Sequence, residues 1–117
     1  MELNIIKKAT IKLPASFKEV LQKINENNLG MVFVVDSNDC LKGSITDGDI
    51  RRALIEGNNL KEGITFNSKA VNREPFSLPF DSDIEEILNY IDQDFKNRTI
   101  KCIPLLNNEG KIVDIST

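Results

Sequence analysis

The sequence contains no histidine, and this absence restricts the possible functions of the chain more than any other feature of its composition. Histidine is the commonest metal ligand and the usual general base near neutral pH. The chain also lacks the CxxC, GxxxxGK(S/T) and GxSxG patterns, which carry metal or redox, phosphate and acyl-transfer chemistry. We therefore expect no catalytic residue, no metal site and no required cofactor in this chain.

Long apolar runs and an excess of positive charge are absent as well. No stretch approaches the roughly 18 apolar residues that span a bilayer, and the N-terminus has no signal-peptide pattern. The net charge of −3, with both signs mixed, gives no basic surface for nucleic acid or anionic lipid. Only two cysteines occur, Cys40 in a predicted turn and Cys102 in a predicted strand. They favour a reducing cytoplasm over a disulfide scaffold, so we expect a cytoplasmic protein without nucleic-acid or membrane partners.

What the chain does contain is an internal repeat. Its 117 residues, 40% hydrophobic, suit one compact domain or two half-domains that share a core. Gly30–Thr46 aligns without a gap on Lys101–Thr117, and the apolar positions coincide. The helix patterns Glu19–Ile24 and Glu86–Ile91 also match, with a short insertion that we place in 92–99. A repeat of this length marks a unit that covers its apolar face with its copy, so the cleft between the copies is the place to look for function.

The first repeat, residues 1–66 with the N-terminal segment, has clear local signals. Ser16 and Glu19 form a capping-box pattern at the start of a helix that ends by Gly30. The other predicted elements are a short strand in the second half of Asn4–Lys12, strands Met31–Val35 and Leu41–Thr46, and a helix from Asp49 to about Glu56.

The second repeat, residues 67–117, follows a connector over 57–75. Its predicted elements are a strand Phe76–Pro79, a helix capped by Ser82 or Asp81 with the apolar stripe Ile84, Ile87, Leu88 and Ile91, and strands Ile100–Leu106 and Lys111–Ser116 around the turn Asn107–Gly110. The first repeat continues past its last threonine into a helix, whereas the second ends at Thr117. We therefore expect the second repeat to be truncated before its last helix and the chain to be part of a longer protein.

The segment from Gly43 to Leu54 is the richest in chemistry. Thr46 and Asp49 stand three residues apart where a strand gives way to a helix, which is the spacing of a capping box. That structural role accounts for both residues without a ligand. The same geometry also suits a ribonucleotide, because helix N–H groups attract phosphate and a carboxylate accepts bonds from ribose hydroxyls. Arg51 and Arg52 either supply a cation to that phosphate or lie on a solvated helix face.

The duplicated helix–strand–strand unit, with Gly43-Ser-Ile-Thr-Asp-Gly-Asp-Ile closing its first copy, resembles a tandem pair of cystathionine-β-synthase (CBS) domains. This resemblance covers nearly the whole chain. It implies a mixed α/β (α+β) fold in which two helix–strand–strand–helix repeats pack with pseudo-twofold symmetry. It also implies a cleft for AMP, ADP, ATP or S-adenosylmethionine as a regulatory ligand, and a homodimer that regulates an attached enzyme.

The resemblance also assigns candidate ligand-binding residues. Thr46 would meet the phosphate or ribose, and Asp49 the ribose hydroxyls. The base pocket would be lined by Thr10, Ile11, Lys12, Met31, Val32 and Phe33. Phe33 stands where many copies carry a proline, here Pro104, and Asp114 replaces Gly43 in the second copy. We expect one competent cleft at most.

The amino-acid sequence of Thr46–Leu54 is similar to the corresponding segment in CBS pairs of sugar-phosphate nucleotidyltransferases and of arabinose-5-phosphate isomerases. In the nucleotidyltransferases the pair lies N-terminal to the catalytic domain, which suits a chain that begins at Met1. We therefore favour a module that regulates a nucleotidyltransferase domain following Thr117. The alternatives are the regulatory domain of an isomerase and a structural dimerisation module without a physiological ligand.

Other polar residues carry weaker signals. Glu85, Glu86, Asp92 and Asp94 have no histidine or companion cluster, so we interpret them as solvated surface. Cys102 lies in an apolar run with no cation nearby to lower its pKa, and we expect a small core residue, not a nucleophile.

Overall fold

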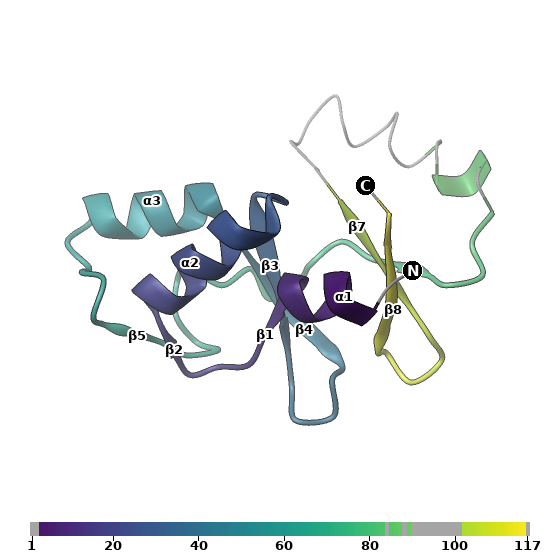
Figure 1. The fold of residues 1–117 in the computed structure, drawn as a ribbon, viewed down its shortest axis with the longest axis horizontal. Coiled ribbons are helices and arrows are strands. Elements are labelled where there is room, and N and C mark those ends of the chain that lie inside the picture. Colours follow the sequence, from purple (N-terminus) through teal and green to yellow (C-terminus); the bar gives the residue numbers. More distant parts are fainter. Residues whose placement is uncertain (1–2, 84, 88, 90–101, 117) are drawn as a thin grey trace.

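The computed structural model describes residues 3–83, 85–87, 89 and 102–116, and Figure 1 shows the arrangement of their elements. In chain order these are α1 (Leu3–Ala9), β1 (Thr10–Ile11), β2 (Ala15–Ser16), α2 (Phe17–Asn27), β3 (Met31–Val35), β4 (Leu41–Thr46), α3 (Asp47–Ile55), β5 (Gly63–Ile64), β6 (Leu78–Pro79), β7 (Ile103–Leu106) and β8 (Ile112–Ser116). Sequence patterns predicted β3 and β4 with these bounds, and α2, β7 and β8 within a few residues.

Two three-stranded sheets repeat the same topology. In the first, β1 runs parallel to β3, and β4 is antiparallel to β3. In the second, β6 is parallel to β7, and β8 is antiparallel to β7. The registers also correspond, because Val32 opposite Ile45 has its counterpart in Ile103 opposite Ser116. Both ladders carry an irregularity at the same place, between Val34 and Val35 and between Leu105 and Leu106, so the sequence repeat is a repeat of backbone geometry.

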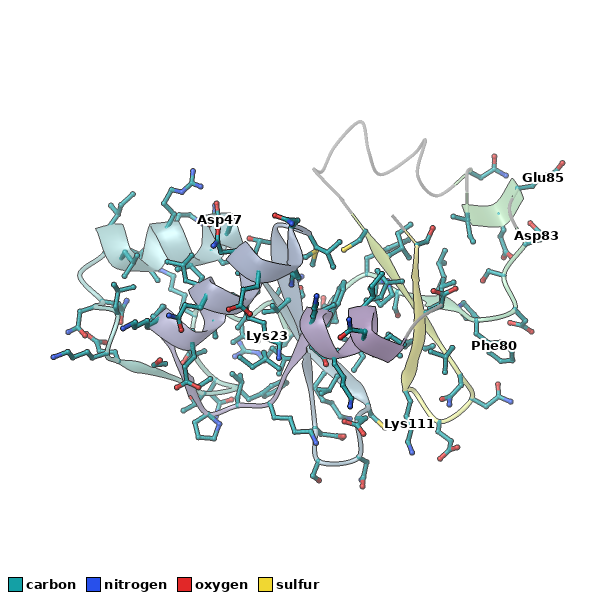
Figure 2. All side chains as sticks on the ribbon, in the orientation of Figure 1. Lys23, Asp47, Phe80, Asp83, Glu85 and Lys111 are labelled. Carbon is teal, nitrogen blue, oxygen red and sulfur yellow. The ribbon has the colours of Figure 1, made fainter. Side chains whose placement is uncertain are left out.

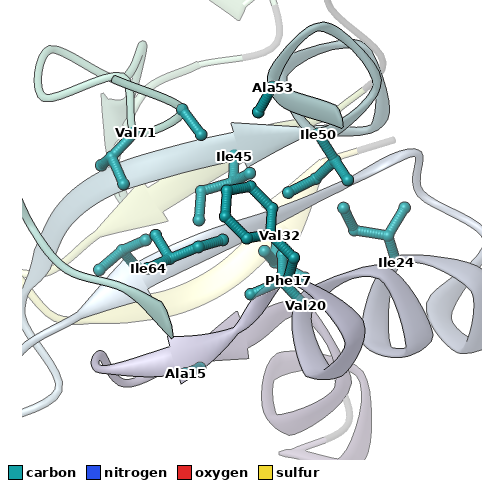
Figure 3. Close-up of a cluster of buried hydrophobic side chains, with 12 residues drawn as sticks. Ala15, Phe17, Val20, Ile24, Val32, Ile45, Ile50, Ala53, Ile64 and Val71 are labelled. Atoms are coloured by element: carbon teal, nitrogen blue, oxygen red, sulfur yellow. The ribbon is translucent and has the colours of Figure 1, made fainter. Parts of the chain in front are cut away.

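Strand β3 is buried on both faces and divides two cores. Val32 and Val34 pack with α2, α3 and β4 in a cluster internal to the first repeat, where Figure 3 shows Phe17 and Ile45. Phe33 and Val35 belong to a second cluster, together with residues of the second sheet: Cys102, Ile112 and Ile115. Because neighbouring residues of a strand point to opposite faces, one apolar run supplies both clusters. The second cluster holds the two sheets together.

The N-terminal segment differs from its prediction. Residues before Thr10 form the seven-residue helix α1, and only Thr10–Ile11 are a strand. Ala9, fully buried, and Ile6 join the cluster between the sheets. Figure 1 shows α1 in the middle of the molecule, beside β8. The helix thus closes one side of the contact between the two repeats.

The connector returns to the first sheet. The backbones of Ser44 and Asn72 exchange two hydrogen bonds of 2.9 Å, which places 70–72 along the free edge of β4. Val71 is buried in the core of the first repeat, and β5 pairs with β2 beneath α2. Part of the connector therefore completes the first repeat.

Two predictions for the second repeat differ from the structure: the residue that caps its helix and the length of its first strand. Among the described residues the capping bond that the structure shows is at Asp83, whose carboxylate accepts the backbone N–H of Glu86 at 2.6 Å, and not at the predicted Ser82 or Asp81; the N–H three residues after Asp81 lies outside the described residues. The strand predicted at Phe76–Pro79 is shorter, Leu78–Pro79. The insertion placed in 92–99 and the stripe positions Ile84, Leu88 and Ile91 lie outside the described residues, while Ile87 packs on Leu78 and Ile103.

Candidate functional site

The junction of β4 and α3 has the geometry that its sequence predicts. Thr46 is the N-cap of α3 in extended conformation, and its hydroxyl accepts the Asp49 N–H at 3.0 Å. The Thr46 N–H donates in turn to Asp49 Oδ2 at 2.9 Å. This reciprocal pair is a capping box with aspartate as its acid, so the structural role expected of the two residues is present.

The two arginines that follow are held by acids of the same helix. Arg52 donates to Asp49 Oδ1 at 2.6 Å, and Arg51 pairs with Asp47. Both arginine side chains remain mostly exposed, at 71% for Arg51 and 68% for Arg52. Ion pairs this exposed contribute little to stability, so either guanidinium is able to exchange its carboxylate for another anion.

The amides at the start of α3 are partly committed. The Asp47 N–H donates to the Gly30 carbonyl at 2.9 Å, and the Asp49 N–H donates to Thr46. Two of the first three amides are therefore unavailable to a phosphate. Gly48 is the remaining one, and a Cβ at that position would approach Arg52 Nη1 to 3.4 Å.

Asp49 faces a small hollow. With Arg52 and Ala53 of α3 it lines a space of about 160 Å³, which Phe17 of α2 and Lys69 of the connector close on the other side. The Asp49 side chain is 22% exposed. Each carboxylate oxygen has a second lone pair, so Asp49 is able to accept further hydrogen bonds without breaking its cap.

A larger hollow, about 640 Å³, lies between α2 and the start of α3. Asp47 and Gly30 line it together with polar residues of α2 and its end: Lys18, Gln22, Asn25 and Asn28. Figure 2 labels Asp47 at this end of α3. Sequence reasoning did not single out these α2 residues. The signal that the sequence offers for them is the run of polar residues at the end of the helix, which includes Asn25, Asn27 and Asn28.

The residues predicted to line a base pocket are dispersed. Val32 and Phe33 are almost fully buried, at 0% and 1% exposure, and belong to two different apolar clusters. Met31 is paired with Thr46, so of the three β3 residues predicted to line the pocket it lies next to the junction of β4 and α3. The Phe33 ring packs in the contact between the sheets and lines neither the hollow at Asp49 nor the hollow at Asp47.

Thr10, Ile11 and Lys12 lie at the other end of the first sheet. Ile11 pairs with Val34 near the end of β3, whereas Thr46 pairs with Met31 at its start. The Lys12 ammonium is 3.4 Å from the Asp39 carboxylate, in the β3–β4 turn. Within one sheet, therefore, the predicted base-pocket strand and the Thr46–Asp49 pair do not face a common space.

Two titratable groups among the described residues have a shifted pKa. Burial raises the pKa of the Cys102 thiol to about 11, which suits the core role predicted for it. The backbone N–H of Cys40 lowers the pKa of Asp36 by donating to its carboxylate. Among the described residues no group of acids and cysteines is arranged to hold a metal ion, and no helix is long and apolar enough to cross a membrane.

Comparison with known proteins gives a family for the first part of the chain and relatives for nearly all of it. Residues 4–56 match the family model of the CBS domain. The arabinose 5-phosphate isomerase KpsF of Escherichia coli is 34% identical over 99 residues, which are 85% of this chain and 29% of that relative. The chain thus spans less than a third of the length of this relative.

Solved structures share the fold. The cytosolic domain of the Mg²⁺ channel MgtE in complex with ATP superposes with a TM-score of 0.72 at 19% identity, covering 93% of this chain and 41% of that one. The protein PAE2072 from Pyrobaculum aerophilum, a CBS domain protein complexed with AMP, gives 0.67 at 18% identity, with 97% and 84% covered. The predicted α+β fold class is confirmed. The similarity to an arabinose 5-phosphate isomerase supports the isomerase alternative and not the nucleotidyltransferase preferred from sequence.

Proposed function

Because residues 4–56 match the family model of the CBS domain, we propose that the whole chain is a pair of CBS repeats that binds an adenosine nucleotide. We further propose that it regulates an attached sugar-phosphate isomerase. The first repeat supplies Thr46 and Asp49, and the second repeat supplies the sheet that packs on Phe33 and Val35.

The main observation in support of a paired arrangement of repeats is the shared register of the two sheets. The parallel short strand, the antiparallel hairpin and the irregularity in the central strand recur at corresponding residues. Regulation by such a pair requires two arrangements of its halves, and a ligand that binds one arrangement more tightly shifts the population toward it.

The ligand class is supported by the chemistry at the start of α3. Asp49 retains acceptor capacity for ribose hydroxyls, while Arg51 and Arg52 are exposed cations one turn away. Proteins of the same fold were solved with ATP and with AMP. The attached isomerase is supported by the relative that aligns with 85% of the chain. The proposed homodimer is testable by light scattering.

A matched pair of variants tests the role of Asp49. In wild-type protein a nucleotide at about 100 times its Kd should stabilise the fold by roughly 2.7 kcal/mol, measured as a thermal shift with AMP, ADP, ATP and S-adenosylmethionine in turn. We expect Asp49→Ala to remove this shift. The control is Glu19→Ala, because Glu19 occupies the same position in the capping box of α2, where its side chain accepts the Ser16 N–H.

Both substitutions delete the acid of a capping box and should lower the free energy of unfolding by about 1 kcal/mol. Only Asp49→Ala should abolish the ligand shift. If the shift survives in both variants, Asp49 is a cap alone. If no nucleotide shifts the wild-type protein, the alternative of a structural dimerisation module without a physiological ligand is favoured instead.

A further inference from the structure

The last residue of α2, Asn27, ties three segments of the chain together through its side-chain amide. Its Nδ2 donates to the Lys8 carbonyl at 3.0 Å and to the Met31 carbonyl at 3.1 Å. Its Oδ1 accepts the Leu29 N–H at 2.8 Å. Two carbonyls on one side and an N–H on the other leave the amide one orientation that satisfies all three partners. The ends of α1 and α2 and the start of β3 therefore meet at one side chain.

The two carbonyls that Asn27 binds lie at the ends of regular elements. Lys8 is in the last turn of α1, whose carbonyls have no partner within the helix. Met31 is the first residue of β3, and the ladder with β1 begins only at Phe33. The amide supplies a donor to each carbonyl, so it stabilises α1 and β3 in this one arrangement.

Helix α1 connects this contact to the second repeat. It lies beside β8 in Figure 1, and Ile6 packs in the same apolar cluster as Ile115 of β8. Leu29 and Met31 pack against that cluster from the other side of the amide. A helix of seven residues is marginal on its own, so the order of α1 depends on its docking between the repeats.

The loop between α2 and β3 extends the contact to the start of α3. Gly30 lies in this loop, and its carbonyl accepts the N–H of Asp47, the first residue of α3, at 2.9 Å. Asn28 and Gly30 have positive φ, 59° and 76°, and together they reverse the chain within residues 28–30. Such a short reversal has no slack to absorb a movement of Asn27, the residue that precedes it.

We propose that Asn27 is a positioning residue that couples α1 to the start of α3. While α1 is docked between the repeats, Asn27 holds loop 28–30, and Gly30 remains against Asp47. When α1 is released, the loop loses this anchor and the start of α3 loosens. Helix α1 is then an element with two states, and both the second repeat and the start of α3 bias its equilibrium. Only the consequence for a ligand rests on the proposed nucleotide function.

Hydrogen exchange, measured residue by residue with NMR, tests the contact itself. Asn27→Ala should speed exchange in the last turn of α1 about tenfold or more, because α1 opens locally. Asn27→Asp keeps an acceptor for Leu29 but has no donor for Lys8, so it should speed this exchange as well. Asn58→Ala is the matched control, because Asn58 Nδ2 donates to the Ala53 carbonyl near the end of α3 at 3.0 Å. It should leave exchange in α1 as in the wild type.

A double-mutant cycle tests the coupling without a ligand. Ile6→Ala removes part of the apolar contact of α1 and should speed exchange of the Asp47 N–H several-fold. In the Asn27→Ala background the same substitution should have no further effect on Asp47. Amides of the β3–β4 ladder are the reference for global unfolding. An equal effect of Ile6→Ala in both backgrounds, or unchanged exchange of α1 in Asn27→Ala, would overturn the proposal.

AMP extends the test to the proposed ligand site. In the wild type AMP should slow exchange in α1 several-fold, since a ligand that orders the start of α3 also favours the docked helix. In Asn27→Ala it should raise the melting temperature without slowing exchange in α1. A thermal shift in the wild type with unchanged exchange in α1 argues against the coupling. Absence of any thermal shift contradicts the nucleotide proposal alone, and the ligand-free cycle then decides the coupling.

Discussion

Gly43 lies where β4 and the connector approach most closely. A Cβ at this position would be 2.9 Å from both the Asn72 carbonyl oxygen and Val71 Cγ1. The backbone of 72 is held there by its two hydrogen bonds to Ser44 and is not free to retreat. We predict that Gly43→Ala lowers the free energy of unfolding by about 1–3 kcal/mol, as overpacking does, measured by urea denaturation.

Gly63→Ala is the control for this substitution. Gly63 also lies in a strand, yet nothing lies within 4 Å of the Cβ it would gain. Its free energy of unfolding should change little or rise slightly, because alanine restricts the unfolded chain. Equal destabilisation by both substitutions would show that a general loss of glycine, and not the contact at Val71, is responsible.

For single residues, the sequence predicted which side chains form a capping pair better than it predicted the face of a strand to which a side chain points. The Thr46–Asp49 spacing predicted a capping box, and both of its bonds are present. The run Met31–Val35, however, is apolar at every position, so nothing in it shows which side chains point to the helices and which to the other sheet. Val32 and Phe33 were therefore grouped in one predicted pocket, although the alternation of a strand sends them to opposite faces.

The two hairpin turns are equivalent elements with different residues. Asp36 Oδ1 accepts the N–H groups of Asn38 and Cys40, and Asn107 Oδ1 accepts those of Glu109 and Lys111. Positive φ falls on corresponding residues, Asp39 at 65° and Gly110 at 84°. An amide oxygen thus performs in the second turn what a carboxylate performs in the first.

This equivalence predicts that Asp36→Asn preserves the turn. Hydrogen bonds from backbone N–H groups lower the pKa of Asp36 from 3.8, so the folded state favours its charged form. Its contribution to stability is present above pH 3.8 and is lost as the pH falls through the lowered pKa. The advantage of wild type over Asp36→Asn in urea midpoint should therefore be largest at neutral pH and should shrink in acid, where the wild type loses this contribution and the variant has none to lose. Asp36→Ala, which lacks an acceptor, should be less stable than both at neutral pH.

Helix α1 shows what local sequence does not contain. It has seven residues and no acid in its first turn, and helices this short are marginal in water on their own. Its stability comes from the burial of Ile6 and Ala9 between the repeats. That contact depends on residues about 100 positions away in β8, so a reading of local pattern found only the strand that follows it.

For the whole molecule, Phe33 is the residue that most clearly joins the two sheets. It is 1% exposed and packs with Cys102, Ile112 and Ile115 across the contact. We predict that Phe33→Ala lowers the free energy of unfolding by about 3–5 kcal/mol. Hydrogen exchange should accelerate most in β7 and β8, because the second sheet loses its support.

Phe17→Ala is the comparison for this prediction. Phe17 is 4% exposed and belongs to the core internal to the first repeat (Figure 3). Its loss should be of similar size, but the faster exchange should appear in β3 and β4. Identical exchange patterns in the two variants would mean that the repeats unfold as one unit and that Phe33 has no special role between them.

The architecture at this scale was the most predictable part of the molecule. The alignment of Gly30–Thr46 on Lys101–Thr117 predicted two equivalent hairpins, and the ladders of both sheets follow it residue by residue. A duplicated sequence contains the same fold information twice, so chance resemblance is less able to mislead. The position of the second repeat against the first depends on side chains of both, and the repeat pattern alone does not specify it.

Because the side chains of β3 alternate between two cores, the strand should tolerate changes in its amino acids better than changes in its number of residues. Methyl groups can be exchanged among Met31–Val35 within the limits of volume. One residue inserted or deleted there would reverse every side chain beyond it, and the aromatic ring that joins the halves would be driven into the helical layer. Reading-frame-preserving indels in this segment are therefore incompatible with the fold, even where conservative replacements are tolerated.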